Sequence, residues 1–273
     1  MSKTKINPIQ GRLNSQVDVI VVGAGSGGIS AAVQASRMGS ETLLIEPSAN
    51  LGGQLLVVPT MDEADIKGVG YPIRKSGIYA EFIDRVREIY DQRGKTLGTC
   101  YWRGDSIGFE PQVAEQVLSE MLEEEPKLTV LLQTYVSMVH THQQTVTGIT
   151  TTEGKTIHCK ILIDATECGD LIPLTPARYR VGNSTSEDIN QDACIQNITY
   201  PAVIEKYPGG APEELVIDDP PPNYEKYLEQ FTATVNHEGY NWYENTCGEA
   251  RDQPCWGNYS YRNCGKRTNA NHQ

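Results

Sequence analysis

The strongest constraint on the fold is a glycine-rich stretch that directly follows an apolar segment near the amino end of the chain. The apolar run Val19–Val22 leads into Gly23-Ala-Gly25-Ser26-Gly27-Gly28, and small residues continue to Ala32. In a strand–turn–helix unit, the first glycine permits a sharp turn, the second lets the backbone approach a pyrophosphate, and the third lets the helix pack closely on the strand. The amino end of that helix offers free N–H groups and roughly half a positive charge to a phosphate pair. The stretch therefore predicts a dinucleotide-binding unit.

Glycine spacing alone is weak evidence, because glycine clusters are common in ordinary turns. Here a second apolar segment, Thr42–Ile45, ends at Glu46. An acid about 20 residues beyond the glycines is expected to accept hydrogen bonds from ribose hydroxyls. The alternative is a glycine-rich turn in some other α/β protein, and the two apolar segments together with Glu46 favour dinucleotide binding.

Composition limits which binding partners the protein can have and in which cellular compartment it is expected. The 273 residues carry a formal net charge of -12, which disfavours binding to nucleic acid or to an anionic membrane surface. No apolar run approaches the ~18 residues that suggest a transmembrane helix, and the first residues lack the apolar core of a secretory signal. The seven cysteines include no C-x-x-C pair, which favours reduced thiols in a cytoplasmic protein and no metal site.

The pattern along the chain predicts an α/β fold. Apolar residues at helical spacing predict helices over 78–92 and 111–125. Alternating patterns predict strands over 128–132, 136–141, 146–151 and 156–164, interpreted as a small meander that leads into a buried final strand. We therefore expect a Rossmann-like parallel sheet with a helical crossover, an inserted β-meander and an incomplete second domain.

Two further stretches bear on the kind of dinucleotide. Gly52-Gly53-Gln54 follows Glu46 within a long excursion, where a plain nicotinamide-binding fold would lead into another helix and parallel strand. Far downstream, Asp164-Ala-Thr-Glu-Cys-Gly-Asp170 forms a second small-residue turn after an apolar segment. A cofactor of two nucleotides joined at phosphate needs support at more than one place, and FAD is the longer candidate. These stretches favour FAD over a nicotinamide cofactor.

At this point the chain resembles a known family, the FAD-dependent oxidoreductases of the two-dinucleotide-binding-domain flavoprotein class. More narrowly, it resembles the bacterial branch related to the A subunit of heterodisulfide reductase. The resemblance covers roughly residues 17–205 and rests on the glycine stretch, Glu46, Leu51–Gln54 and Asp164–Leu171, with Cys100-Tyr-Trp and Phe109–Ala114 in matching order. Members of this class are usually much longer, so the chain looks like the first half of such an enzyme.

The resemblance implies a role for individual residues. Gly23, Gly25 and Gly28 would hold the pyrophosphate, with Ser26 and Gly27 completing the loop, and Glu46 would bind the adenosine ribose. Gly52, Gly53 and Gln54 would pass beside the flavin, the backbone of Val136 would contact the adenine, and Thr166, Gly169 and Asp170 would close on the diphosphate and ribityl side. Two open alternatives are that Gly52-Gly53 is only a turn and that Asp170 is only a helix cap.

The expected domains are an N-terminal extension over 1–16, an FAD-binding domain over 17–175, and a partial substrate or cap region with an irregular tail over 176–273. The favoured function is an FAD-dependent oxidoreductase that transfers hydride or electrons from a small-molecule substrate to an acceptor, neither of which is identified. A complementing subunit or a homo-oligomer is the expected protein partner. The alternatives are a non-catalytic fragment or subunit that needs a second chain, and an NAD(P)-dependent dehydrogenase. The residues identify no catalytic acid or base.

Overall fold

The structure is a computed structural model, and it describes residues 14–56, 77–95, 97–100, 103–181, 199–204, 210, 212–216, 219–220, 222–225 and 255–260. The chain divides into two compact units, of which the first comprises residues 1–97 and 107–196 and the second residues 98–106 and 197–273. The second unit therefore includes residues 98–106, which lie within the range predicted for the FAD-binding domain. The predicted domain boundaries stay predictions.

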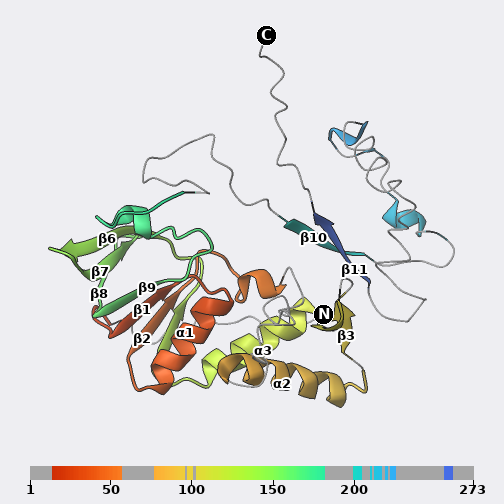
Figure 1. The fold of residues 1–273 in the computed structure, drawn as a ribbon, viewed down its shortest axis with the longest axis horizontal. Helices are drawn as coiled ribbons and strands as arrows, with labels where there is room; N and C mark the ends of the chain where they lie inside the picture. Colours follow the sequence, from red (N-terminus) through yellow and green to blue (C-terminus); the bar gives the residue numbers. More distant parts are fainter. Residues whose placement is uncertain are drawn as a thin grey trace, which may run out of the picture. The chain divides into compact units, whose positions relative to one another are not determined.

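A four-stranded parallel sheet forms the centre of the first unit (Figure 1). Its strands lie in the order β5-β2-β1-β9, with bounds β1 (Val19–Val22), β2 (Thr42–Ile45), β5 (Leu128–Leu131) and β9 (Ile161–Asp164). Every residue of β1 and β2 is buried. Such continuous runs of valine, isoleucine and leucine are typical of parallel strands that are covered on both faces.

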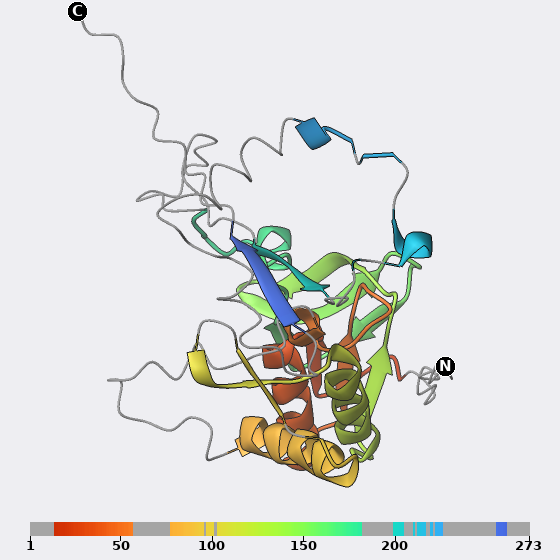
Figure 2. The ribbon, with the colours of Figure 1, turned by 90° about the vertical axis from the view of Figure 1, so that its right-hand side faces the viewer.

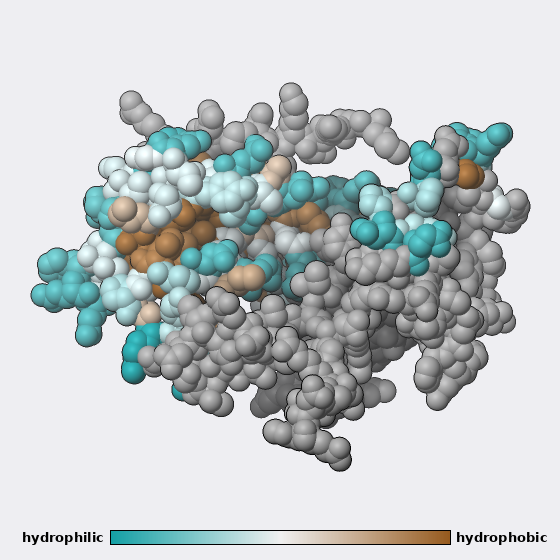
Figure 3. All heavy atoms as spheres, turned by 90° about the horizontal axis from the view of Figure 1, so that it is seen from above, coloured by the Kyte–Doolittle hydropathy of each residue, from teal (hydrophilic) through white to brown (hydrophobic). Residues whose placement is uncertain are grey.

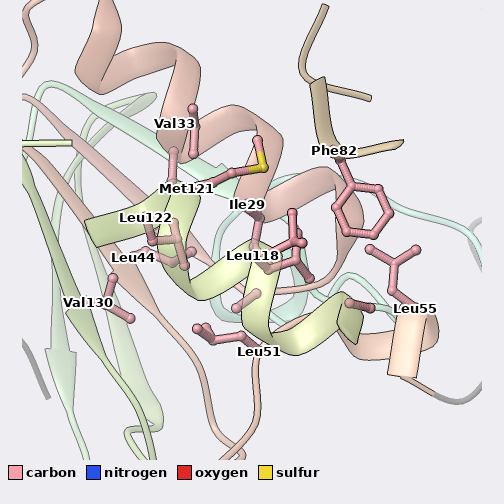
Figure 4. Close-up of a cluster of buried hydrophobic side chains, with 14 of the residues drawn as sticks. Ile29, Val33, Leu44, Leu51, Leu55, Phe82, Leu118, Met121, Leu122 and Val130 are labelled. Carbon is pink, nitrogen blue, oxygen red and sulfur yellow. The ribbon is translucent and has the colours of Figure 1, made fainter. Parts of the chain in front are cut away.

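Helices cover one face of this sheet (Figures 1 and 2). Helices α1 (Ser26–Arg37) and α3 (Pro111–Glu123) lie against the sheet, and α2 (Gly77–Gln92) packs against these two helices. Figure 4 shows how their apolar side chains meet the sheet: Ile29 of α1 and Met121 of α3 lie close to Leu44 of β2, and all three are at most 1% exposed. Phe82 of α2 packs edge-on against the ring of Phe109, with ring centroids 5.5 Å apart. The helical layer is thus one continuous core with the sheet.

An antiparallel meander covers the opposite face of the sheet. It consists of β6 (Val136–His142), β7 (Thr145–Thr151) and β8 (Thr156–His158). Ile149 and Ile157 of the meander pack with Ile20 and Ile45 of the parallel sheet in a second buried cluster. The first unit therefore has three layers, which are helices, parallel sheet and antiparallel meander.

Ion pairs join the three helices at one end. Arg37 donates hydrogen bonds from Nη1 and Nη2 to Glu81 of α2 at 2.6 and 3.0 Å, and from Nε to Glu125 at 2.7 Å. Arg85 bridges Glu81 and Glu124, also at 2.6 to 2.7 Å. The hydrogen bond from Arg37 holds the pKa of Glu81 below its usual value. Glu125 is buried, with 8% of its side chain exposed, so Arg37 neutralises a carboxylate that has left most of its water.

Some large apolar side chains of the first unit reach the surface instead. Met138 of β6 and Ile161 of β9 are 54% and 56% exposed. Seen from above, the described part of this unit shows apolar residues among hydrophilic ones (Figure 3). None of the helices in the described ranges is long and apolar enough to cross a membrane.

The described strands of the second unit form two short pairs, and only the β10–β11 pair, which is antiparallel, joins segments far apart in the sequence. Strand β10 (Thr199–Ile204) pairs with β11 (Cys255–Ser260), and β3 (Gly98–Cys100) pairs with β4 (Arg103–Gly108). The 3-10 turn η5 (Glu213–Leu215) lies between β10 and β11 in the sequence. Strand β11 lies in the stretch that was predicted to be an irregular tail. That prediction was based on the scarcity of aliphatic residues there, and the pairing of β11 with β10 shows that it was wrong for residues 255–260.

The elements of the first unit confirm most of the predicted ranges, with four differences. The predicted strand over 128–132 is β5, an edge strand of the parallel sheet and not part of the meander. The predicted strand over 156–164 is two strands, β8 and β9, and the chain turns between them where the N–H groups of Lys160 and Ile161 both donate to the carbonyl of Asp18. The prediction that the final strand is buried was wrong, because β9 lies at the edge of the sheet and its residues are exposed or half-buried. The long excursion predicted after Glu46 is present and contains η1 (Gly53–Leu56), α2, β3, β4 and α3, but it does end in a helix and a parallel strand, α3 and β5, which was not expected from the sequence.

Candidate functional site

The carboxyl ends of the four parallel strands bring the predicted site residues to one edge of the sheet. From β1 the chain passes to β2 and β5 on one side, and it then returns to place β9 on the other side of β1. Ligands of open α/β sheets bind outside the carboxyl ends of the strands where the strand order reverses in this way. The loops after β1 and β9 therefore define the centre of the candidate site.

Gly23 and Gly28 allow the loop after β1 to pack against the loop after β9. Gly23 has φ +99°, and its N–H donates to the carbonyl of Ile45 at 2.8 Å. A Cβ on Gly23 would overlap the carbonyl oxygen of Ala165, and a Cβ on Gly28 would overlap the carbonyl oxygen of Gly23. These two glycines are therefore required by the packing of the site itself.

The amino end of α1 has no side-chain cap. Its N-cap residue is Gly25, no acidic residue lies in the first turn, and the N–H of Ile29 makes the first turn's bond to the carbonyl of Gly25 at 3.0 Å. The N–H groups before Ile29 have no partner within the helix. A Cβ on Gly27 would meet no atom of the described residues within 4 Å. This end of the helix thus presents backbone donors and a partial positive charge, and no side chain of its own first turn caps them.

A second pair of glycines, Gly52 and Gly53, lies beside the loop after β1. Gly52 and Gly53 have φ +111° and +51°, and the N–H of Gly52 donates to the carbonyl of Ala24 at 2.8 Å. Leu51 and Leu55 anchor this turn in the core beneath α3 (Figure 4). A Cβ on Gly53 would lie 3.1 Å from the Cα of Gly25, so two backbones without side chains meet here.

Glu46 links the loops after β1 and β2. Its Oε2 accepts the N–H of Ala24 at 2.7 Å, and its Oε1 accepts the N–H of Ser48 at 2.8 Å. The loop after β5 adjoins it, since the N–H of Thr134 donates to the carbonyl of Glu46 at 3.1 Å. Each carboxylate oxygen has further lone pairs, so Glu46 can accept ribose hydroxyls in addition to these backbone donors.

Asp164 organises the loop after β9. Its Oδ1 accepts hydrogen bonds from the N–H and the hydroxyl of Thr166 at 3.1 and 2.7 Å, and its Oδ2 accepts the N–H of Leu171 at 3.0 Å. The hydroxyl of Thr166 in turn accepts the N–H of Asp170 at 2.7 Å. Gly169 has φ +71°, which the reversal of the loop needs. One carboxylate thus holds the shape of the whole turn.

The structure places the predicted residues around these loops. Gly25, Gly53 and Gln54 lie together, with the loop that begins at Thr166 beside them. Gly23 and Gly28 lie beneath, within the packing of the loop. Val136 begins β6 and packs against the core between sheet and meander, two residues beyond Thr134. The roles that the resemblance implies for these residues stay predictions.

Three residues of this site were not assigned a role from the sequence. Asp164 and Glu167 were quoted only as part of the second turn, and Ser48 was not considered. A signal for them existed in the topology. If the apolar segments 19–22 and 161–164 pair as parallel neighbours, the turns that follow them lie side by side. Sequence spacing did not show that Glu167 reaches Gly25 and Gly53.

Comparison with known proteins adds independent information. The family model described as FAD dependent oxidoreductase matches residues 18–271. The tRNA uridine 5-carboxymethylaminomethyl modification enzyme MnmG of Desulfotalea psychrophila is 28% identical over 170 residues, which cover 59% of this chain and 25% of that enzyme. Increased recombination centers protein 15 of Saccharomyces cerevisiae is 31% identical over 110 residues, which cover 39% of this chain and 18% of that protein. The chain spans about a quarter or less of the length of these curated relatives.

Some solved structures are also similar to this chain. L-amino acid deaminase from Proteus vulgaris is 18% identical with a TM-score of 0.42, covering 60% of this chain and 50% of its own. GidA of Aquifex aeolicus is 19% identical with a TM-score of 0.39, covering 56% of this chain and 25% of its own.

Proposed function

The chain belongs to the FAD-dependent oxidoreductase family, and on that premise we propose that it is the FAD-binding part of a flavoenzyme. FAD is the cofactor of this family, and the isoalloxazine ring of FAD supplies the hydride or electron transfer when it is bound. The contribution of this chain is to bind the dinucleotide and to orient it.

The observation that carries the proposal is the region between Gly25 and Gly53 at the uncapped amino end of α1, where neither backbone carries a side chain of its own and the exposed side chain of Glu167 lies close by. A diphosphate needs backbone donors, a positive potential and room for its oxygens, and this region offers all three. We propose that Gly25, Ser26 and Gly27 hold the diphosphate. Glu46 would bind the adenosine ribose, with Val136 near the adenine.

The other end of the cofactor would lie toward the second pair of glycines. We propose that Gly52, Gly53 and Gln54 pass beside the flavin end, and that the turn containing Thr166, Gly169 and Asp170 closes on the ribityl side. In this arrangement Asp164 is a positioning residue, because it acts through the shape of that turn.

We propose that the active unit includes a further chain or a further segment. The match covers only 25% and 18% of the two curated relatives, and the described residues offer no group that we assign as catalytic acid or base. The alternative is a non-catalytic fragment that binds FAD weakly or not at all, so it differs from our proposal in FAD retention as well as in turnover. The match to the FAD-dependent oxidoreductase family model disfavours the alternative of an NAD(P)-dependent dehydrogenase.

The substrate and the branch within the family remain proposals as well. MnmG carries tRNA modification in its name, but we propose a small-molecule substrate and no nucleic-acid partner for this chain, since its net charge of -12 would repel a phosphate backbone. A place near the branch related to the A subunit of heterodisulfide reductase, and a cytoplasmic location, are proposed on the sequence motifs and the cysteine pattern alone.

The variant Gly25→Asp tests the proposed diphosphate position. Gly25 has φ -71° and ψ -176°, a backbone that any residue adopts, and aspartate is a favoured N-cap residue. The variant should therefore fold normally, while its carboxylate occupies and repels the diphosphate, so that FAD binds at least about tenfold more weakly. Gln144→Asp, in the exposed turn between β6 and β7, adds the same charge away from the site and should bind FAD like the wild type. Equal FAD affinity for Gly25→Asp and the wild type, measured by quenching of flavin fluorescence, would place the diphosphate elsewhere.

A further inference from the structure

The side chain of Glu167 lies beside Gly25 and Gly53, in the region that these two glycines leave open. Its Oε1 is 3.0 Å from the position that a Cβ on Gly25 would take, and 3.4 Å from the corresponding position on Gly53. Apart from the chain neighbours of Gly25, this oxygen is the only atom of the described residues within 4 Å of the first position. A carboxylate therefore fills the space where glycine permits a ligand to approach the backbone.

The surroundings explain why an anion rests there. The amino end of α1 carries a partial positive charge and has neither a side-chain cap nor an acidic residue in its own first turn. Glu167 comes from the adjoining turn after β9 and brings the missing negative charge to this end. The amide of Gln54 contacts the carboxylate only weakly, with Nε2 3.4 Å from Oε2.

The contact is built to be reversible. Glu167 is an exposed residue, whereas Asp164 and Thr166 are half-buried and fix the turn that carries it. The 3.4 Å separation from Gln54 is long for a hydrogen bond. The Glu167 side chain can therefore leave by rotating about its own bonds without unfolding the turn.

We propose that Glu167 is an internal anion that occupies the diphosphate position of the cofactor-free protein and competes with FAD for it. The inference rests on the proposed binding of FAD at this position. A diphosphate and a carboxylate cannot both lie against Gly25, because they share the same volume and carry like charges. FAD binding therefore requires displacement of Glu167, and the charge of Glu167 sets how tightly the cofactor is retained.

Two substitutions separate the charge of this residue from its bulk. Glu167→Gln keeps the size and removes the charge, and Glu167→Ala removes both. Because like charges a few ångströms apart at an exposed site repel modestly, we expect Glu167→Gln to tighten FAD binding about 5- to 50-fold. Glu167→Ala should tighten it by at least as much. Glu123→Gln, at the exposed carboxyl end of α3, removes the same charge away from the site and should leave the affinity unchanged.

The experiment is a titration of the cofactor-free protein with FAD, followed by flavin fluorescence, on the wild type and these three variants. Inorganic pyrophosphate serves as a smaller probe in a thermal melt and should stabilise Glu167→Gln more than the wild type. Unchanged or weaker FAD binding by both Glu167 variants, with a wild type that does bind, would overturn the inference and leave the proposed function standing. If neither the wild type nor any variant binds FAD or pyrophosphate, the proposed function fails, and the inference fails with it.

Discussion

Replacing Asp164 with alanine tests whether one carboxylate holds the turn at the centre of the site. The change removes the acceptor of three hydrogen bonds, two from Thr166 and one from Leu171. Bonds to a charged acceptor contribute about 1.5–3 kcal/mol each when buried, and about 1 kcal/mol each is a better value for a half-exposed carboxylate. The variant should therefore lose about 3 kcal/mol of free energy of unfolding. Leu171, which is 4% exposed, should lose its fixed place in the core between sheet and meander.

The assay is urea unfolding followed by far-UV circular dichroism, combined with hydrogen exchange of the peptide that spans 164–174. Exchange in that peptide should rise more than exchange in β1 or β2, because the damage starts in the turn. Asp164→Asn should lie between alanine and the wild type, since an amide can accept on one side only. Asp170→Ala removes an exposed carboxylate from the same turn and should stay within about 0.5 kcal/mol of the wild type. If Asp164→Ala unfolds and exchanges like Asp170→Ala, the hydrogen bonds to Asp164 do not support the turn.

Three further predictions concern packing and charge in the first unit. Gly28→Ala would force a Cβ onto a backbone carbonyl oxygen, and should lower the free energy of unfolding by about 2–4 kcal/mol in urea unfolding; a loss under about 1 kcal/mol would contradict the packing. Arg37→Met leaves the buried carboxylate of Glu125 without its cation and should cost about 2–3 kcal/mol, whereas Arg87→Met, whose ion pair is exposed, should cost less than about 0.5 kcal/mol; equal losses would refute the difference. The pKa of Glu81 is lowered in the folded state, so the stability that this carboxylate contributes is present above its unfolded pKa of about 4.5 and is lost as pH falls through the lower folded value. The difference in free energy of unfolding between the wild type and Glu81→Gln should therefore shrink at low pH in acid unfolding. A difference that does not change with pH would exclude this linkage.

The local elements of the first unit could be predicted from sequence because each carries its own signal. Val19–Val22 followed by the glycines predicts strand, turn and helix, and the structure shows that sequence in β1 and α1. The apolar spacing in 78–92 and 111–125 predicts α2 and α3, with the second helix ending two residues early at Glu123. The FAD-dependent family was also predictable, because the glycine stretch, Glu46 and the second turn occur in the right order.

The partner of each strand could not be predicted in the same way. The residues of β5 alternate in burial like those of a meander strand, and only the parallel pairing with β2 distinguishes them. The pairing of β10 with β11 joins segments about 55 residues apart, and neither carries a local signal for the other. Likewise, the position of Glu167 against Gly25 depends on β9 lying beside β1, which is a property of the sheet and not of either segment.

The glycines of the site have two different roles. Gly23 and Gly28 serve the packing of the loop, whereas Gly25 and Gly53 leave room at the surface of the site. Glycine is therefore needed at these positions for two different physical reasons, close packing at Gly23 and Gly28 and open space at Gly25 and Gly53. The difference predicts that substitutions at Gly28 act on stability, and that substitutions at Gly25 act on cofactor binding.

The most direct test of FAD binding by this chain is the amount of flavin that the purified protein retains. The protein should be saturated with FAD, passed through a desalting column, and examined by visible absorption, with the released nucleotide identified chromatographically. We predict a flavin spectrum near one FAD per chain, and no comparable retention of NAD(P)H. A folded, colourless protein that takes up no added FAD would contradict the proposed function.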